Sequence, residues 1–236
     1  MTSAKKSRWN YVGLDFWFKL LIMKKIFLIL SLAVVLFGCA VGLREEEFLH
    51  PIVDSDITLS EALQKYSPPE FKKRQKLLDL LYYSFDGQVH KGQIVIDERL
   101  ASDIKKVFRV ALKNKFPIGS VIPISHKRFY KDGEWNEDNQ SMLSNNSAGF
   151  NYRKVTGGTV LSMHAYGFAV DINPVQNPYI KDGVVLPLGA VYDKNIPGTL
   201  TRNCPVVKTF KRLGWTWGGD WKSLKDYQHF QKVLRR

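Results

Sequence analysis

Apolar and polar residues alternate in short blocks along the chain after residue 77, a pattern that predicts several short strands and helices. The apolar and aromatic run over 78–85 ends at Asp86-Gly87, which predicts a strand followed by a turn, and residues 93–96 predict a second strand. Apolar residues recur at helical spacing over 98–114, where Asp97 can cap the first turn. We therefore expect a strand, a turn, a second strand and a helix, in this order.

The rest of the domain shows shorter patterns. Residues 121–124 predict a brief strand, 130–147 a polar loop, 205–213 a helix that Gly214 ends, and 215–217 a further strand. Helices and strands alternate without a regular β-α-β repeat, and the sequence shows no internal repeat. These features predict an α+β domain.

One segment, LSMHAYGFAVDINP over 161–174, combines this patterning with candidate chemistry. From residue 168 the apolar and polar positions alternate, so Asp171 lies on the polar face of a predicted strand. Gly167 allows the chain to bend between this strand and His164, so the imidazole and the carboxylate can converge. Both groups are good zinc ligands, but a catalytic zinc needs three ligands from the protein.

A third ligand is available in WGGDWKSLKDYQHF, residues 217–230, where Asp226 and His229 lie three residues apart. A helix would place them on one face, whereas a strand would need a bend between them. In a hydrolytic zinc site, His229 would bind the metal, and Asp226 would accept a proton from the water that the metal activates. The alternative from spacing alone is a strand-end aspartate and two partly buried histidines held by hydrogen bonds.

Three motifs of this chain are similar to those of the VanY-like zinc peptidases, which cut the stem peptides of peptidoglycan. The motifs are SxHxxGxAxDIN, WGGDW and DYxHF. This family comprises D-alanyl-D-alanine carboxypeptidases and phage L-alanyl-D-glutamate endopeptidases. The resemblance covers roughly residues 78–230. It implies an α+β fold with a small central antiparallel sheet flanked by helices, like the folds of DD-peptidases and Hedgehog domains.

By this resemblance, one Zn²⁺ ion would be bound by His164, Asp171 and His229, with Asp226 as the general base. Family members often carry glutamate at the position of Asp226, and aspartate is shorter by one methylene. Arg153 matches an arginine that lies beside the substrate carbonyl or carboxylate in the family. Its guanidinium would help to stabilise the tetrahedral oxyanion.

The resemblance also implies a substrate and a reaction. Ser162 and Tyr166 are expected to contact substrate or to support the ligands. The form HAYGxAxDINPxQNP looks closest to the endopeptidase branch, which implies a metallopeptidase, a hydrolase that cleaves the L-Ala–D-Glu bond. Two alternatives stay open. One is a carboxypeptidase that removes terminal D-Ala, and the other is a non-catalytic zinc-containing module that binds the cell wall, since Hedgehog domains keep both fold and metal.

The amino-terminal part has the features of an export signal. Residues 23–39 read MKKIFLILSLAVVLFGC, in which two lysines precede an apolar run. This run is shorter than the roughly 20 residues that a membrane span needs. Its end resembles a bacterial lipobox, in which Cys39 is acylated after cleavage, and an uncleaved anchor is the alternative. Residues 1–22 are unlike a signal peptide, so we interpret them as an overlong gene start, 40–76 as a tether and 77–236 as the peptidase domain.

Composition excludes several other classes of protein. Two cysteines, Cys39 and Cys204, are too few for a disulfide scaffold or a cysteine-rich zinc finger, and neither GxxxxGK[ST] nor HExxH occurs. Cys204 precedes a proline at a predicted helix start, where the helix dipole lowers the pKa of a thiol. A cysteine peptidase, however, would leave His164 and Asp171 without a role. The other histidines are expected at the surface or in the tether: His50, His90 and His126.

Charge and export narrow the choice of partners. The chain has 35 basic and 22 acidic residues, a formal net charge of +13, and the part after residue 38 keeps a charge of +8. An exported, tethered basic protein is well placed to meet the acidic polymers of the cell wall and poorly placed to meet nucleic acid. We therefore expect a monomeric lipoprotein of the cell envelope that is anchored in a membrane, faces the periplasm or cell wall, and acts on peptidoglycan.

Overall fold

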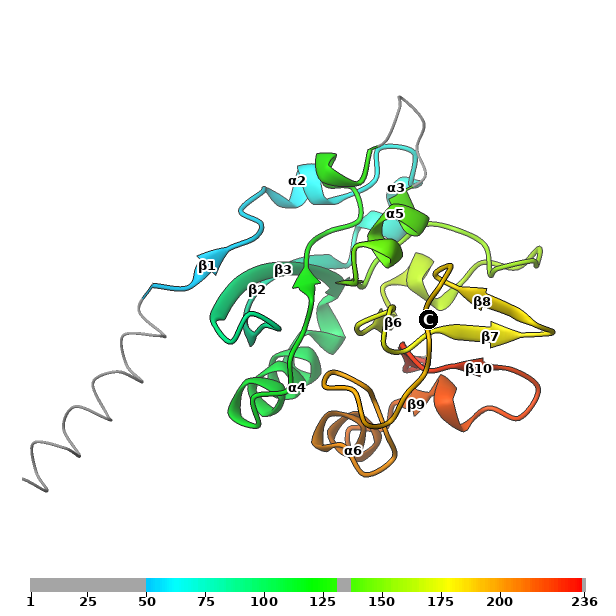
Figure 1. Cartoon of the computed structure of the whole chain (residues 1–236). Coiled ribbons are helices and arrows are strands. Elements are labelled where there is room, and N and C mark those ends of the chain that lie inside the picture. Colours follow the sequence, from blue (N-terminus) through cyan, green and yellow to red (C-terminus); the bar gives the residue numbers. More distant parts are fainter. Residues whose placement is uncertain (1–49, 131–136, 235–236) are drawn as a thin grey trace, which may run out of the picture. The chain divides into compact units, whose positions relative to one another are not determined.

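Figure 1 shows the protein as a computed structural model, which describes residues 50–130 and 137–234. The elements given below belong to one compact unit, Pro51–Arg236. The predicted signal segment, Cys39 and residues 40–49 lie outside the described residues. Among the helices of the described part, none is both long and apolar enough to cross a membrane.

The two longest strands form the curved hairpin of Figure 1, β2 (Gln75–Tyr83) and β3 (Val89–Asp97). They pair antiparallel over their whole length, and the short β1 (Ile52–Val53) adds a parallel edge to β3. Gly87 in the turn has a φ of 83°, a backbone conformation that favours glycine. Both strands predicted for this region are confirmed, and each is longer than the sequence pattern indicated.

Helix α4 (Ala101–Lys113) follows β3 through one 3₁₀ turn, η1 (Glu98–Leu100). Asp97 caps this turn, because its carboxylate accepts a hydrogen bond from the backbone N–H of Arg99 at 3.0 Å. The apolar stripe of α4 is buried against β2 and against helix α6 (Pro205–Arg212). Both predicted helices are therefore confirmed, the first with a tighter opening turn.

The remaining strands of the described residues are short and form separate small sheets. Their bounds are β4 Ser120–Val121, β5 Asn146–Ser147, β6 Ala169–Asp171, β7 Tyr179–Lys181, β8 Val184–Leu186, β9 Thr216–Trp217, β10 Lys225–Asp226 and β11 His229–Gln231. One antiparallel sheet has the order β6-β11-β9 and another the order β10-β7-β8, which Figure 1 shows as the yellow hairpin beside β10. Strands β4 and β5 pair in parallel.

Short helical turns connect these strands. They are α2 Leu59–Ala62, α3 Pro69–Lys72, η2 Lys127–Phe129, α5 Glu137–Leu143, η3 Met163–Tyr166 and η4 Gly218–Asp220. Helix α5 lies in the segment predicted as a polar loop, and its Ser141 hydroxyl accepts a hydrogen bond from Asn146 at 2.9 Å. The strand predicted over 121–124 stops at Val121, since Pro123 has no N–H to donate to a neighbouring strand.

The fold is α+β, as predicted, but the arrangement of its strands differs from the expected one. Several small sheets replace a single central antiparallel sheet, and two of them contain parallel pairs, β1 with β3 and β4 with β5. Most of these strands are two or three residues long, so each can extend a sheet only locally.

Residues 51–76 belong to the domain, which corrects their interpretation as part of a tether. The side-chain oxygen of Gln93 in β3 accepts hydrogen bonds from the hydroxyl of Ser55 and the backbone N–H of Ile57, both at 2.8 Å. A polar segment of this kind resembles a linker in sequence because its partners lie much later in the chain. The domain therefore begins at Pro51 rather than near residue 77.

Gly92 in β3 allows β4 to lie against the hairpin, because a Cβ atom there would overlap the backbone carbonyl oxygen of Val121. We expect Gly92→Ala to lower the free energy of unfolding by about 1–3 kcal/mol through overpacking, as measured by urea denaturation. In the control Gly158→Ala, the new methyl comes close only to Cγ2 of the exposed Val155 and meets no other atom closer than 3.7 Å, and a change below about 0.5 kcal/mol is expected. Equal losses in the two variants would contradict this role for Gly92.

Candidate metal centre

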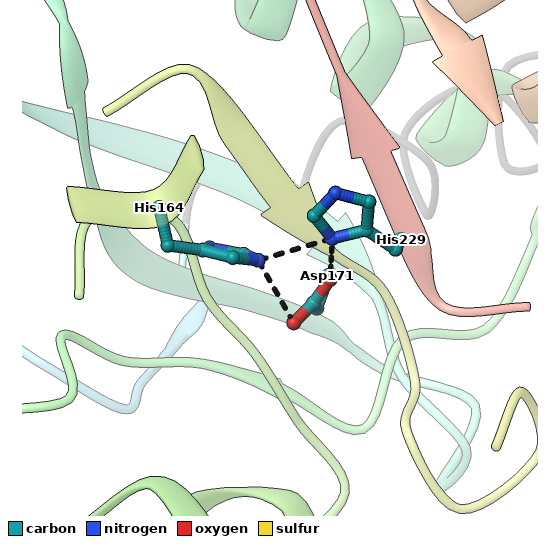
Figure 2. A group of neighbouring side chains, drawn as sticks. All are labelled: His164, Asp171 and His229. Atoms are coloured by element: carbon teal, nitrogen blue, oxygen red, sulfur yellow. Dashed lines mark hydrogen bonds and ion pairs between the residues drawn. The ribbon is translucent and has the colours of Figure 1, made fainter. Parts of the chain in front are cut away.

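His164, Asp171 and His229 meet at one point, as Figure 2 shows. Nε2 of His164 lies 3.1 Å from Oδ2 of Asp171 and 3.2 Å from Nδ1 of His229. Nδ1 of His229 in turn lies 3.0 Å from Oδ1 of Asp171. Both imidazoles are buried and the aspartate is partly buried. The structure thus brings together the three residues that the sequence motifs nominate as ligands.

His164 is positioned by the short helix η3. The Oγ atom of Ser162 caps this helix and accepts a hydrogen bond from the backbone N–H of His164 at 3.3 Å. Gly167 ends it with a φ of 69° and turns the chain into β6. A Cβ atom on Gly167 would overlap the side chain of Gln75, so both its conformation and its size are required. The bend expected between His164 and the strand is therefore confirmed.

Asp171 and His229 are positioned by the pairing of β6 with β11, in which they are direct antiparallel partners. Directly opposed residues project to the same side of a sheet with Cβ atoms about 5 Å apart. On its other edge, the backbone of Asp171 exchanges hydrogen bonds with Ala148, at 2.9 and 3.1 Å. Asp171 is thus held between two neighbouring segments, which fixes its carboxylate toward both histidines.

The outer nitrogen of each imidazole faces an oxygen that can only accept a hydrogen bond. Nδ1 of His164 lies 2.6 Å from the carbonyl oxygen of Gly149, and Nε2 of His229 lies 3.0 Å from Oε1 of Gln231. These two nitrogens therefore carry the ring protons, and the lone pairs of His164 Nε2 and His229 Nδ1 point at the centre. Together with the Asp171 carboxylate they make three acceptors that face one another, an arrangement that calls for a cation.

The donor set fits zinc. Two imidazole nitrogens and one carboxylate oxygen are a ligand set of hydrolytic zinc sites, which leave the fourth position open. Ligands at zinc distances in a tetrahedral arrangement lie about 3.3 Å from one another. Here the two imidazole nitrogens lie 3.2 Å apart, each lies 3.0–3.1 Å from a different oxygen of Asp171, and one ligand atom from each residue lies within 4.8 Å of the other two. The residues present therefore fit a single zinc ion.

The same convergence shifts the protonation of the metal-free site. Burial alone would lower the pKa of His229. The hydrogen bond and charge of Asp171, together with the charge of Asp226, outweigh this effect of burial and raise the pKa of His229 to about 9. Burial likewise raises the pKa of Asp171, but His164 and His229 outweigh it and hold that pKa well below its usual value. A proton on His229 therefore occupies the centre when no metal does.

Asp226 lies beside the metal centre, on β10. A turn separates it from His229, so the two residues belong to different sheets, and the bent-strand alternative is correct rather than the helical one. Desolvation by burial raises the pKa of Asp226 to about 6, and the charge of Asp171 adds to this effect. Its Oδ1 atom is buried and has no hydrogen-bond partner among the described residues.

His164, Asp226 and His229 all line one cleft of about 360 Å³. Arg153 also lines it, and its Nε lies 2.9 Å from Oδ2 of Asp138 in an ion pair. Ser162 lines the cleft as well, in addition to capping η3. Three of the four residues expected to act beside the ligands, Asp226, Arg153 and Ser162, thus line the same cleft.

Tyr166 does not line this cleft, contrary to the expectation that it contacts substrate there. Its ring lies between Phe71 and Phe168, with centroid distances of 5.2 and 5.9 Å, in a separate cavity of about 270 Å³. In a 3₁₀ helix a full turn takes three residues, so His164 and Tyr166, two positions apart, project to different sides. Tyr166 is therefore corrected to a packing residue of η3.

The residues of the cleft that were not anticipated from the sequence include Lys181, Trp221 and Gln231. All three line the cleft, and the Trp221 ring lies 5.4 Å from that of His229. Gln231 follows His229 by two positions in a strand, so the alternation of side chains could have predicted its contact with the imidazole. Nothing in the sequence near Lys181 indicates which pocket it lines.

The remaining candidates have other roles. Cys204 is buried at the start of α6, and desolvation raises the pKa of its thiol, opposite to the lowering that a nucleophile needs. His90 is buried rather than at the surface, and its two ring nitrogens lie 3.0 Å from carboxylate oxygens of Asp54 and Asp86. Neither residue belongs to the cleft.

Comparison with known proteins connects this site to a family. Residues 156–232, which include all three ligands and Asp226, match the family model described as D-alanyl-D-alanine carboxypeptidase. The chain is similar to the peptidoglycan L-alanyl-D-glutamate endopeptidase CwlK of Bacillus subtilis (strain 168), with 30% identity over 164 residues that make up 66% of this chain and 90% of that protein. No solved structure matches the chain, and the likeness to the Hedgehog fold stays a prediction.

Zinc must displace the proton of His229, whose pKa in the metal-free protein is about 9. Protonation therefore competes with binding below this pH, and we expect the apparent zinc affinity to rise by about tenfold per pH unit up to about pH 9. Competition with a chromophoric chelator at a series of pH values measures this slope. His90→Gln, which removes a histidine outside the cleft, should leave the slope unchanged, and an affinity independent of pH would contradict the assignment.

Proposed function

Because the chain belongs to the D-alanyl-D-alanine carboxypeptidase family of VanY-like peptidoglycan peptidases, we propose that it is a zinc-dependent hydrolase that cleaves the L-Ala–D-Glu bond of peptidoglycan stem peptides. One observation carries this proposal. His164 and His229, which form a group of three facing ligands with Asp171, line the same cleft as Asp226, a partly buried carboxylate whose pKa is raised to about 6. A base next to an open metal position is what hydrolysis by water requires.

The protein's own groups divide the remaining work. A zinc ion bound by the three ligands supplies Lewis acidity at the open position of the site. Asp226 accepts the proton of the attacking water on its carboxylate and returns it to the leaving amine. Aspartate is one methylene shorter than glutamate, but Asp226 lines the same cleft as His164 and His229, which supports this role.

Arg153 and Ser162 are placed to bind the substrate. Nη1 of Arg153 donates to the carbonyl of Lys154 at 3.1 Å and its Nε is paired with Asp138, which fixes the plane of the guanidinium. Its Nη2 has no partner among the described residues and would donate to the oxygen on which negative charge develops. Ser162 accepts a hydrogen bond at Oγ, so its own O–H remains available as a donor.

The choice of the L-Ala–D-Glu bond rests on similarity. The motif HAYGxAxDINPxQNP resembles the endopeptidase branch, and the relative that shares 30% identity is named as an L-alanyl-D-glutamate endopeptidase. Removal of terminal D-Ala is the alternative, because the matching family model is described as a carboxypeptidase. A non-catalytic zinc module is less well supported, since Asp226 would have no role in it.

We also propose that the enzyme works as a monomer tethered to a membrane of the cell envelope through acylated Cys39. Each residue with a role in the proposed reaction comes from the same chain. The apolar run and lipobox-like end over 23–39 support export and anchoring. A cysteine that carries several acyl chains binds a membrane durably, whereas a single chain binds only marginally.

The scissile bond can be identified by digestion of purified muropeptides with the zinc-loaded protein and mass spectrometry of the products. We expect fragments with a new amino-terminal D-Glu from the wild-type protein. Asp226→Asn should bind zinc normally and lose about 10²–10⁴-fold in rate, the usual contribution of a general base. Release of free D-Ala would favour the carboxypeptidase alternative. A wild-type protein that holds zinc and leaves muropeptides intact would favour the binding module.

Acylation can be followed by labelling cells with a radioactive fatty acid. We expect the label on the wild-type protein and none on Cys39→Ser, because the thiol of Cys39 is the acceptor. Cys204→Ser is the matched control and should keep the label, since Cys204 is buried in the domain. An unlabelled wild-type protein would contradict the anchor.

A further inference from the structure

The cleft beside the metal centre holds a positive charge that nothing in the described part of the chain neutralises. Two lysine or arginine side chains line this cleft, Arg153 and Lys181. Arg153 is paired with Asp138 at 2.9 Å. The side chain of Lys181 is exposed and makes no ion pair or hydrogen bond with a described residue. Its ammonium group is therefore free to bind an anion.

The sheet β10-β7-β8 sets the position of Lys181 relative to the proposed base. Tyr179 of β7 is the direct partner of Asp226 of β10. Lys181 is two residues further along β7, on the same face as Tyr179 and about 7 Å from it, and all three residues line the cleft. Its flexible four-carbon stem allows the ammonium to reach back toward the space in front of Asp226. Figure 1 shows the β7–β8 hairpin lying along β10.

The substrate offers an anion at this place. In stem peptides D-Glu is joined onward through its γ-carboxyl group, so its α-carboxylate is free and lies two bonds from the scissile nitrogen. A terminal D-Ala carries the same group in the same position. Asp226 would repel this carboxylate, since both are negative, and a cation on the same side of the cleft would offset the repulsion.

We propose that Lys181 binds the free α-carboxylate of the substrate residue on the amine side of the scissile bond, and so selects substrates in which this carboxyl group is ionised. The inference rests on the proposed function and gives that site a specificity. An α-amide at the same position would keep the shape of the substrate but lose the charge-assisted hydrogen bond. Peptides with D-isoglutamine in place of D-Glu should therefore be poor substrates.

The test compares two synthetic stem peptides, one with D-Glu and one with D-isoglutamine after L-Ala, as substrates of the full-length zinc-loaded protein. We expect the wild-type protein to prefer the D-Glu peptide by about 10- to 100-fold in kcat/KM, the usual effect of a hydrogen bond between charged groups. Lys181→Met should reduce this ratio to about 1 by slowing only the D-Glu peptide. Lys181→Arg, which keeps the charge, should retain most of the preference.

Lys222→Met is the matched control, because it removes an exposed lysine that does not line the cleft, and its ratio should equal that of the wild-type protein.

A third peptide ending in D-Ala-D-Ala shows which carboxylate is used. If this peptide is hydrolysed preferentially and Lys181→Met loses that preference, the same contact is assigned to terminal D-Ala. Equal hydrolysis of the D-Glu and D-isoglutamine peptides by the wild-type protein would overturn the proposal and leave the proposed function intact. An equal loss on both peptides in Lys181→Met would also overturn it. If the wild-type protein cleaves none of the three peptides, the proposed function fails, and the inference with it.

Discussion

Three hydrogen-bond acceptors face one point in this protein, and they can stay there only if a cation or a proton lies between them. The carbonyl oxygen of Gly149 and Oε1 of Gln231 hold the ring protons of the two histidines on the outside, so the inner lone pairs have no hydrogen of their own. The direct pairing of Asp171 with His229 adds a carboxylate on the same face. Metal and proton therefore compete for a single place, and the raised pKa of His229 measures how strongly the metal-free site attracts positive charge.

The two aspartates near this point have opposite electrostatic environments. Two histidines contact Asp171 and hold its pKa down, which suits a permanent ligand. At Asp226, desolvation outweighs the charges of His229 and His164, and the pKa of this carboxyl group rises to about 6. A carboxylate that gains and loses a proton near neutral pH can serve as a base, whereas one that stays ionised cannot. Their environments thus divide the two carboxyl groups into a ligand and a proton carrier, although both are the same residue type.

How much the sequence could predict depended on the distance over which the residues act. Asp171 and the bend at Gly167 followed from local alternation and from the conformational freedom of glycine, and both are confirmed. The path from Asp226 to His229 crosses from one sheet to another, which no local pattern encodes. Residues 51–76 resembled a tether for the same reason, because their hydrogen bonds go to β3. The neighbours of Lys181 likewise come from strands that pair only in the folded domain.

The environment of Asp226 also bears on whether the domain catalyses a reaction or only binds the cell wall. A buried polar atom without a partner costs about 1–3 kcal/mol of stability, and Oδ1 of Asp226 is such an atom among the described residues. The pairing of β10 with β7 is made by backbone groups and does not need a carboxylate at this position, and a module that only bound the cell wall would have no proton for this carboxylate to transfer. Strained or destabilised ionisable groups are typical of active sites, where function offsets the loss. The cost of keeping Asp226 beside the metal centre therefore favours catalysis.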